Sequence, residues 1–191
     1  MKITAVLGSP RTKGNSATIV AMVLESLQKA GPQTRIFELN RMSYRGCQAC
    51  MACKTASETC VVRDDLSPVL EEITISDVVL IASPIYMWEV TGQMKSFIDR
   101  CYSYLKPDFR TNPLPGRLNP GKKLVFILSQ GNPDEAMYAD IVLRHTNMFK
   151  RLGFSEIYPI RAVGAGPQSE VNRNSAILES VARTAAGILA S

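Results

Sequence analysis

Short apolar runs alternate with helical patterns along the chain. The apolar runs, rich in β-branched residues, predict five strands at residues 2–8, 34–38, 77–82, 122–128 and 156–163. Apolar residues at helical spacing predict helices at residues 16–30, 66–73 (capped by Asp64 or Asp65), 91–105, 134–152 and 170–189. Strands that alternate with helices in this way are typical of a parallel sheet covered on both faces.

Five such strands fit the doubly wound order 2-1-3-4-5, whose ligand lies beyond the carboxyl ends of the strands. Ser9, Ser83 and Ser129 follow predicted strands and therefore fall at this edge. We predict a single α/β domain over residues 1–191, with a five-stranded parallel sheet of this order and helices on both faces. A cysteine-rich insertion occupies residues from about 44 to 63.

The composition favours a cytoplasmic globular protein. Hydrophobic residues make up 46% of the 191 residues and charged residues 20%. No segment approaches the roughly 18 consecutive apolar residues of a membrane span. The first apolar run is followed by Gly8-Ser9-Pro10-Arg11, which lacks the small residues of a cleavage site. The net charge of +5 comes from scattered Lys and Arg residues, so we expect a solvated basic surface and neither a nucleic-acid nor a membrane partner.

Residues 106–121 hold four prolines, two glycines and no periodicity, which predicts a long loop. Loops of this length in a compact domain serve as lids, interfaces or binding segments.

A polar loop links the first predicted strand to a helix. Residues 8–16 read Gly-Ser-Pro-Arg-Thr-Lys-Gly-Asn-Ser. The hydroxyls of Ser9 and Ser16, the Asn15 amide and backbone N–H groups at a helix start can all donate to an anion, and Arg11 adds positive charge. The spacing matches neither G-x-x-x-x-G-K-S/T nor G-x-G-x-x-G. The loop therefore suits a single phosphate, and an ordinary polar turn is the alternative.

Three blocks, in order and at matching spacing, resemble the NADPH-dependent FMN reductase group of flavodoxin-like proteins. They are residues 8–16, residues 83–100 beginning Ser-Pro-Ile-Tyr, and residues 129–133, Ser-Gln-Gly-Asn-Pro. The resemblance runs through nearly the whole chain. It implies a flavodoxin-like fold, bound FMN, NAD(P)H as co-substrate, and a homodimer or homotetramer in which a neighbouring subunit completes the flavin site.

The resemblance also assigns the FMN-binding residues by position. Those expected to hold the phosphate are Ser9, Arg11, Asn15 and Ser16. Those expected to border the isoalloxazine are Pro84, Ile85, Tyr86 and Trp88, with backbone donors from Ser129, Gln130 and Gly131 at its other edge. Tyr86 and Trp88 as ordinary packing aromatics are the alternative. No residue is assigned an acid–base role, because hydride transfer needs only an open flavin face.

Four of the five cysteines fall within fourteen residues, in the order Cys47-x2-Cys50-x2-Cys53-x6-Cys60. Four thiolates on a short loop can ligate one 4Fe-4S cluster. The pattern resembles the compact motif of the iron–sulfur flavoproteins, a branch of the same group, although Glu58 stands where relatives often have glycine. Zinc and free thiols stay open as alternatives. Cysteines at every third residue would diverge on a helix, so a cluster requires a non-helical loop or a helix start.

The fifth cysteine and the single histidine suggest no further site. Cys101 shares a helical stripe with Met94, Phe97 and Ile98, which predicts a buried and inert thiol. His145 has no ligand-like partner one helical turn away, and no G-x-S-x-G is present, which disfavours a hydrolase.

Two functions follow from these expectations. The first is an NAD(P)H-dependent FMN oxidoreductase that reduces a flavin, a quinone or another small acceptor. The alternative is an iron–sulfur flavoprotein that transfers electrons between a ferredoxin-like donor and an unknown acceptor. A one-electron centre is superfluous for simple hydride transfer, so the cysteines separate the two. A binding module without flavin is the least favoured interpretation.

Overall fold

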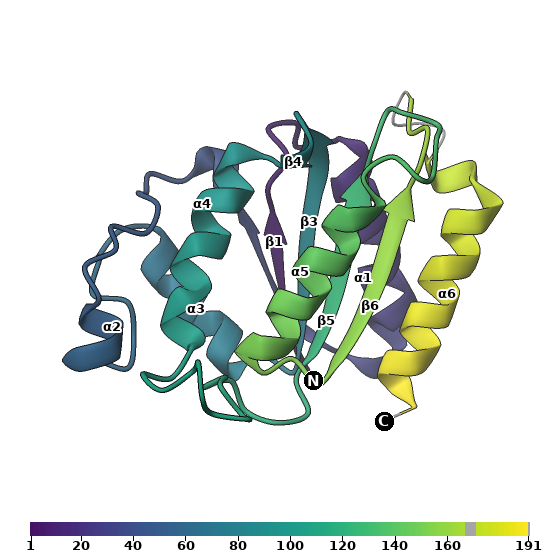
Figure 1. Cartoon of the computed structure of the whole chain (residues 1–191). Helices are drawn as coiled ribbons and strands as arrows, with labels where there is room; N and C mark the ends of the chain where they lie inside the picture. Colours follow the sequence, from purple (N-terminus) through teal and green to yellow (C-terminus); the bar gives the residue numbers. More distant parts are fainter. Residues whose placement is uncertain (167–170, 191) are drawn as a thin grey trace.

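The computed structural model describes residues 1–166 and 171–190, and a twisted parallel sheet runs through its centre (Figure 1). The five long strands are ordered β2-β1-β3-β5-β6 and pair in parallel. Their bounds are β1 Lys2–Leu7, β2 Gln33–Glu38, β3 Val78–Tyr86, β5 Lys123–Ser129 and β6 Glu156–Ala162. Counted as long strands alone, this is the predicted order 2-1-3-4-5, and the flavodoxin-like fold class is confirmed.

Helices cover both faces of the sheet (Figure 1). On one face lie α1 (Asn15–Leu27) and α6 (Ser175–Leu189), and on the other α3 (Leu66–Ile75), α4 (Gly92–Arg100) and α5 (Ala139–Leu152). The short α2 (Ala52–Thr55) lies outside these layers, and 3-10 turns are η1 (Gln28–Ala30), η2 (Leu39–Arg41), η3 (Cys101–Tyr104) and η4 (Val171–Arg173). Within the described ranges, no helix has the length and apolar character that crossing a bilayer requires.

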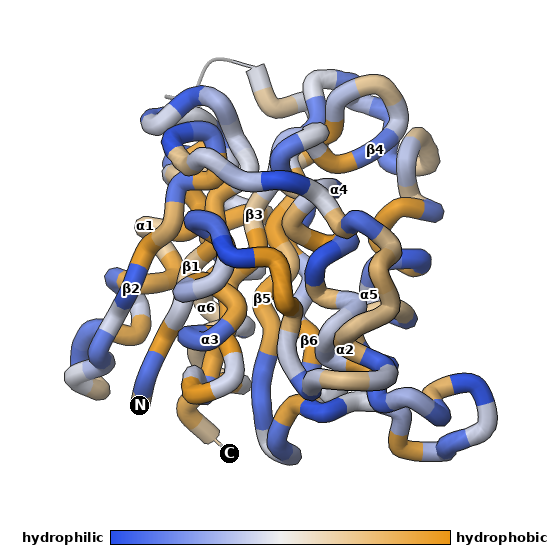
Figure 2. The backbone as a smooth tube through the Cα atoms, turned by 90° about the vertical axis from the view of Figure 1, so that its left-hand side faces the viewer, coloured by the Kyte–Doolittle hydropathy of each residue, from blue (hydrophilic) through white to orange (hydrophobic). Residues whose placement is uncertain are grey.

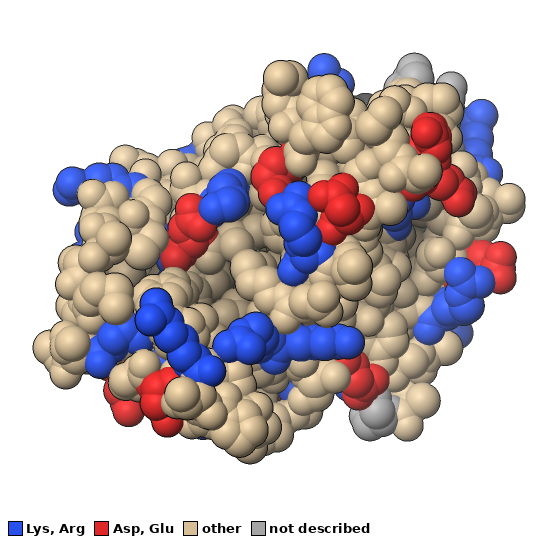
Figure 3. Space-filling view, in the orientation of Figure 1, with Lys and Arg blue, Asp and Glu red and all other residues tan. Residues whose placement is uncertain are grey.

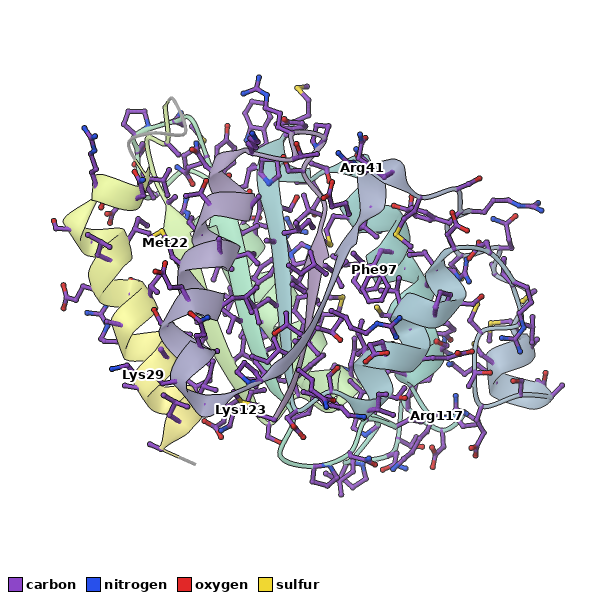
Figure 4. All side chains as sticks on the ribbon, turned by 180° about the vertical axis from the view of Figure 1, so that it is seen from behind. Met22, Lys29, Arg41, Phe97, Arg117 and Lys123 are labelled. Carbon is purple, nitrogen blue, oxygen red and sulfur yellow. The ribbon has the colours of Figure 1, made fainter. Side chains whose placement is uncertain are left out.

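The inner strands are apolar at successive positions because both of their faces are buried (Figure 2). In β3, Val79 and Ile81 pack with the helices of one face, and Val78 and Leu80 pack with those of the other. Phe97 is fully buried and points from α4 toward the sheet (Figure 4). The apolar side chains between α4 and the sheet thus fix the position of this helix and of both its ends.

Several predicted boundaries need correction. The helix predicted from 134 begins only at Ala139, because Asn132 Oδ1 accepts from Asp134 N and Asp134 Oδ1 accepts from Ala136 N, which favours turns over a helix. The helix predicted over 91–105 ends at Arg100 and continues as η3. The two-residue strand β4 (Glu89–Val90), which pairs antiparallel with β3, was not predicted. The predicted start of the last helix, at 170, lies outside the described residues.

The loop at 106–121 lies at the amino-terminal edge of the sheet, opposite the carboxyl ends of the strands (Figure 1). It folds back on itself, since Lys106 N donates to Pro115 O and Arg117 N donates to Tyr104 O. It also contacts the cysteine-rich insertion, because Arg117 donates to the carbonyls of Cys53 and Glu58. In one chain this loop therefore borders the cysteines and not the carboxyl edge.

Gly116 should be a sensitive point of this loop. A Cβ at Gly116 would lie 2.3 Å from the backbone oxygen of Leu152, which cannot move without shifting the end of α5. We expect Gly116→Ala to lower the free energy of unfolding by about 1–3 kcal/mol. Gly92→Ala is the matched control, because nothing lies within 4 Å of its Cβ position. Urea unfolding midpoints test this, and equal midpoints for the two variants would contradict the packing.

Candidate functional site

Segments that follow β1, β3, β5 and β6 meet at the carboxyl edge of the sheet. Gly8 N donates to Ala82 O over 2.8 Å, and Gly8 O accepts from Thr91 Oγ1 over 2.7 Å, which ties the loop after β1 to the start of α4. A Cβ on Gly8 would lie 2.7 Å from Met94 Cβ. The segments enclose a cavity of about 170 Å³, lined by Ser9, Arg11, Gly14, Asn15, Ser16, Pro84, Ile85, Tyr86, Ser129, Gln130, Gly131, Ala165 and Gly166. All of the predicted FMN-binding residues except Trp88 are therefore brought together.

The start of α1 faces this cavity without a side-chain cap. Gly14 is its N-cap, and the first turn holds no acidic residue, so the positive end of the helix is available to an anion. Ser16 Oγ and Ser129 Oγ are buried and lie 3.0 Å apart. Ser9 Oγ accepts from Arg11 N over 3.1 Å, which leaves its own proton to donate. Hydroxyls and helix start together form an anion-binding cradle.

Asn15 differs from the expectation that its amide donates to the anion. Its Nδ2 donates to Gly166 O over 3.0 Å and to Ala165 O over 3.4 Å. Among the described residues, its buried Oδ1 has no hydrogen-bond partner. Asn15 therefore ties α1 to the segment after β6, and the atom it leaves open is an acceptor that calls for a donor such as a ligand hydroxyl.

An aromatic rim borders the cavity where β3 turns into β4. Met87 and Trp88, the two residues of this turn, have positive φ values of 44° and 63°. Trp88 is 61% exposed and contacts Tyr138 edge to face, with ring centroids 5.8 Å apart. Tyr86 lines the cavity and is about half exposed. The structure thus places Trp88 beyond the cavity wall and Tyr86 in it.

Gln130 lines the cavity, but its polar groups mainly hydrogen-bond to neighbouring segments of the protein. Its backbone N–H donates to Ala162 O over 2.9 Å, and its Nε2 donates to the carbonyls of Asn132 and Asp134. Its Oε1 accepts from Arg161. Of the three backbone donors predicted at 129–131, the Gly131 N–H is the one that takes no partner within the described residues.

The four clustered cysteines line a second cavity, which lies at the carboxyl-terminal end of α4. It measures about 230 Å³ and is lined by Cys47, Gln48, Ala49, Cys50, Met51, Cys53, Cys60, Val61, Val62, Arg100, Tyr102 and Ser103. The backbone here is irregular, and Ala49 and Met51 have positive φ values of 51° and 58°. Cys53 lies in the short α2 and Cys60 in an irregular segment, so neither is held away by regular structure. Within the described ranges, no three potential ligands converge as tightly as a single metal ion requires.

Two buried cations contact sulfurs of this cavity. Arg100 Nε donates to Cys60 Sγ over 3.0 Å, and Arg100 Nη1 pairs with Asp64 Oδ2 at 2.8 Å. Lys54 Nζ donates to Cys53 Sγ over 3.4 Å. Sequence analysis included Arg100 in the block of residues 83–100, but it gave neither Arg100 nor Lys54 and Asp64 a role at the cysteines. No local pattern points from these side chains to the sulfurs.

The two cavities lie at opposite ends of α4. Thr91, its N-cap, touches the loop after β1, whereas Arg100, its last residue, touches the cysteine cavity. Helices rise about 1.5 Å per residue, so the nine residues of α4 span about 14 Å. One chain thus carries two separate candidate sites.

Cys101 and His145 lie in the core. Burial raises the pKa of the Cys101 thiol, which keeps it neutral and unreactive. His145 Nδ1 lies 2.9 Å from Ile141 O, its ring stacks on Phe126, and its Nε2 lies 3.4 Å from Glu89 Oε1. His145 therefore contacts β4 through Glu89.

Residues 1–154 match the family model of the NADPH-dependent FMN reductases, and the chain belongs to this family. An iron-sulfur flavoprotein of Archaeoglobus fulgidus is 34% identical over 145 residues, which cover 75% of this chain and 63% of that protein. An iron-sulfur flavoprotein of Methanocaldococcus jannaschii is 35% identical over 105 residues, covering 55% of this chain and 52% of that protein. The chain spans less than two thirds of the length of these relatives.

Among solved structures, an NAD(P)H:quinone oxidoreductase from Methanothermobacter marburgensis superposes with a TM-score of 0.74. The superposition covers 97% of this chain and 95% of that one at 18% identity, and it shows that the two proteins share a fold.

Proposed function

We propose that this chain is an FMN-binding oxidoreductase that takes electrons from NAD(P)H and passes them to a flavin, a quinone or another small acceptor. The observation that carries the proposal is the cavity at the carboxyl edge of the sheet. There the uncapped start of α1 and three serine hydroxyls form an anion cradle beside an aromatic rim. Membership of the FMN reductase family and the solved NAD(P)H:quinone oxidoreductase of the same fold support it.

The residues present fit FMN. Ser9 and Ser16 would donate to the phosphate together with the first N–H groups of α1, and Arg11, which is exposed, would add charge from solvent. The open Oδ1 of Asn15 would accept from a ribityl hydroxyl, since a phosphate offers it no proton. The assignment of Asn15 thus changes from phosphate donor to ribityl acceptor.

Bound FMN would supply two-electron hydride acceptance and stepwise electron release. Pro84 and Ile85 form the cavity wall and would exclude water from one side of the ring system. Tyr86 would border the ring, and the Gly131 N–H would donate to its polar edge. Trp88, anchored on Tyr138, stands at the rim, where a nicotinamide would enter.

We further propose that Cys47, Cys50, Cys53 and Cys60 hold a 4Fe-4S cluster. All four line one cavity, three of them on irregular backbone and Cys53 near the start of the short α2. A cluster is a larger body than one ion, so its ligands need not converge as the sulfurs of a zinc site must, at about 2.3 Å from the metal. When bound, the cluster would exchange single electrons with FMN or with a partner.

An electron-transfer function is the second candidate, and the surface beside the cysteines favours it. Lys106 and Arg117 line an open depression next to the cysteine cavity, together with Glu58, Asp108 and the buried Lys54. Lys and Arg side chains also form a band across the lower part of the face shown in Figure 3, with Asp and Glu side chains below it. A ferredoxin-like donor with an acidic surface would be steered to such a region.

We propose a homodimer or homotetramer as the working form. The two cavities of one chain lie at opposite ends of α4, so a second copy is the simplest way to place cysteines near a flavin. Tyr86, Met87 and Trp88 expose apolar surface at the flavin rim, with Met87 87% exposed.

The phosphate cradle predicts much tighter binding of FMN than of riboflavin. Ser16→Ala should remove a charge-assisted hydrogen bond of about 1.5–3 kcal/mol and weaken FMN more than tenfold. Ser26→Ala, at the far end of α1, is the control because its hydroxyl only donates to Met22 O. Calorimetric titration measures the FMN affinity of both variants. Equal affinities of the wild-type chain for FMN and riboflavin would contradict the assignment of the phosphate to this loop.

The electron donor can be determined on one anaerobic preparation. We expect NADPH or NADH to bleach the flavin absorbance within seconds to minutes, because the rim leaves one face open to a nicotinamide. If reduced ferredoxin bleaches it rapidly and both nicotinamides act slowly, the electron-transfer function replaces the reductase function.

Iron and sulfide content distinguishes the three interpretations of the cysteines. After anaerobic reconstitution we expect about four irons and four sulfides per chain. Cys60→Ala should lose the cluster, whereas Cys101→Ala, whose thiol is buried in the core, should keep it. Zinc without sulfide, or free thiols after reconstitution, would contradict the cluster.

A further inference from the structure

Arg100 joins the cysteine-rich insertion to the body of the protein through a single buried guanidinium. Its side chain is 0% exposed, and all of its partners come from residues 45–64. Nη1 donates to Arg45 O and to Asp64 Oδ2, Nη2 donates to Val62 O, and Nε donates to Cys60 Sγ. One side chain of α4 thus fixes both the path of the insertion and the position of one sulfur.

The contact with Cys60 is favourable for an anionic sulfur. A neutral thiol is a weak acceptor, whereas hydrogen bonds between a cation and an anion are short and strong. The 3.0 Å distance from Arg100 Nε to Cys60 Sγ is short for a sulfur acceptor. Asp64, the one carboxylate on this guanidinium, also accepts from the backbone of Arg45 and Leu66, so its charge is shared. The guanidinium therefore retains positive charge toward the sulfur.

Lys54 makes a similar contact with a second sulfur of the cavity. Its Nζ donates to Tyr102 O over 2.7 Å and Leu105 O over 2.8 Å, and it lies 4.0 Å from the centre of the Tyr102 ring. Its third hydrogen bond goes to Cys53 Sγ, at 3.4 Å. No carboxylate pairs with Lys54 in the described part of the chain, so the nearest group that can carry negative charge is the sulfur.

The other two cysteines lack a hydrogen bond from a cation in the described part of the chain, although Cys47 lies within Coulombic range of Lys54. Cys47 and Cys50 are exposed, and within the described ranges their sulfurs accept no hydrogen bond. The cavity thus holds two sulfurs that accept from buried cations, those of Cys53 and Cys60, and two exposed cysteines, Cys47 and Cys50.

We propose that Lys54 and Arg100 are positioning residues that hold Cys53 and Cys60 for a cluster and raise its reduction potential. Reduction adds an electron to the cluster, and nearby positive charge and N–H donors to sulfur stabilise the more negative form. The inference rests on the proposed function, because it requires that the four cysteines carry a cluster. It assigns the tuning to two side chains that the spacing of the cysteines does not specify.

The test is a redox titration of the anaerobically reconstituted full chain, monitored by electron paramagnetic resonance. We expect Lys54→Gln to shift the ratio of oxidised to reduced cluster about tenfold toward the oxidised form, which is about 59 mV for a one-electron couple. Lys54→Arg, which keeps the charge, should restore most of the potential. Lys106→Gln is the matched control, because its Nζ donates to Leu114 O and touches no sulfur.

Arg100→Lys tests the second contact. A lysine paired with Asp64 cannot also supply the Nε donor to Cys60, so we again expect a lower potential. FMN affinity reports whether this variant is folded, because the flavin cavity lies at the other end of α4. If Arg100→Lys loses FMN, the Lys54 series decides alone.

The outcomes separate the two proposals. If the wild-type chain assembles no cluster, the cluster assignment and this inference both fall. If the wild type is loaded but Lys54→Gln has the same potential as Lys106→Gln, the cluster stands and the tuning role is overturned.

Discussion

The parallel direction of all five long strands is the constraint on which the other features depend. Parallel strands place their carboxyl ends at one edge, so residues 9–16, 84–86 and 129–131, far apart in the chain, line one cavity. Because the strands are parallel, the chain must return along a face of the sheet before the next strand can begin. The helix α4 makes one of these returns and runs from the carboxyl edge to the opposite edge. Its two ends become the natural positions for two sites.

The cysteine-rich insertion depends on a different kind of support. It has little regular structure of its own, and α2 is only four residues long. Arg100 and Arg117 hold it instead, by donating to carbonyls of the insertion. Lys54, which is part of the insertion, donates outward to the carbonyls of Tyr102 and Leu105. Arg117 is labelled in Figure 4. A buried cation whose partner is removed is strongly destabilising, so these contacts act together and fix the insertion against α4 and η3.

Sequence patterns predict the strands and helices of this protein well. The inner strands are easy to recognise because burial on both faces makes them apolar at successive positions. The strand order follows from topology rules, and the same rules place the polar loop at residues 8–16 at the carboxyl edge of the sheet. The start of α5 could not be predicted, because the side chains of Asn132 and Asp134 compete with the helix for backbone N–H groups. The role of Arg100 was equally hidden, since its burial depends on contacts with residues about 40 positions earlier in the chain.

The two-site arrangement is tested most directly by anomalous diffraction at the iron edge from crystals grown without oxygen in the presence of FMN. We predict iron density in the cavity lined by Cys47, Cys50, Cys53 and Cys60, and the FMN phosphate at the start of α1 against Ser9 and Ser16. A phosphate bound away from α1, or iron bound outside the cysteine cavity, would contradict the arrangement.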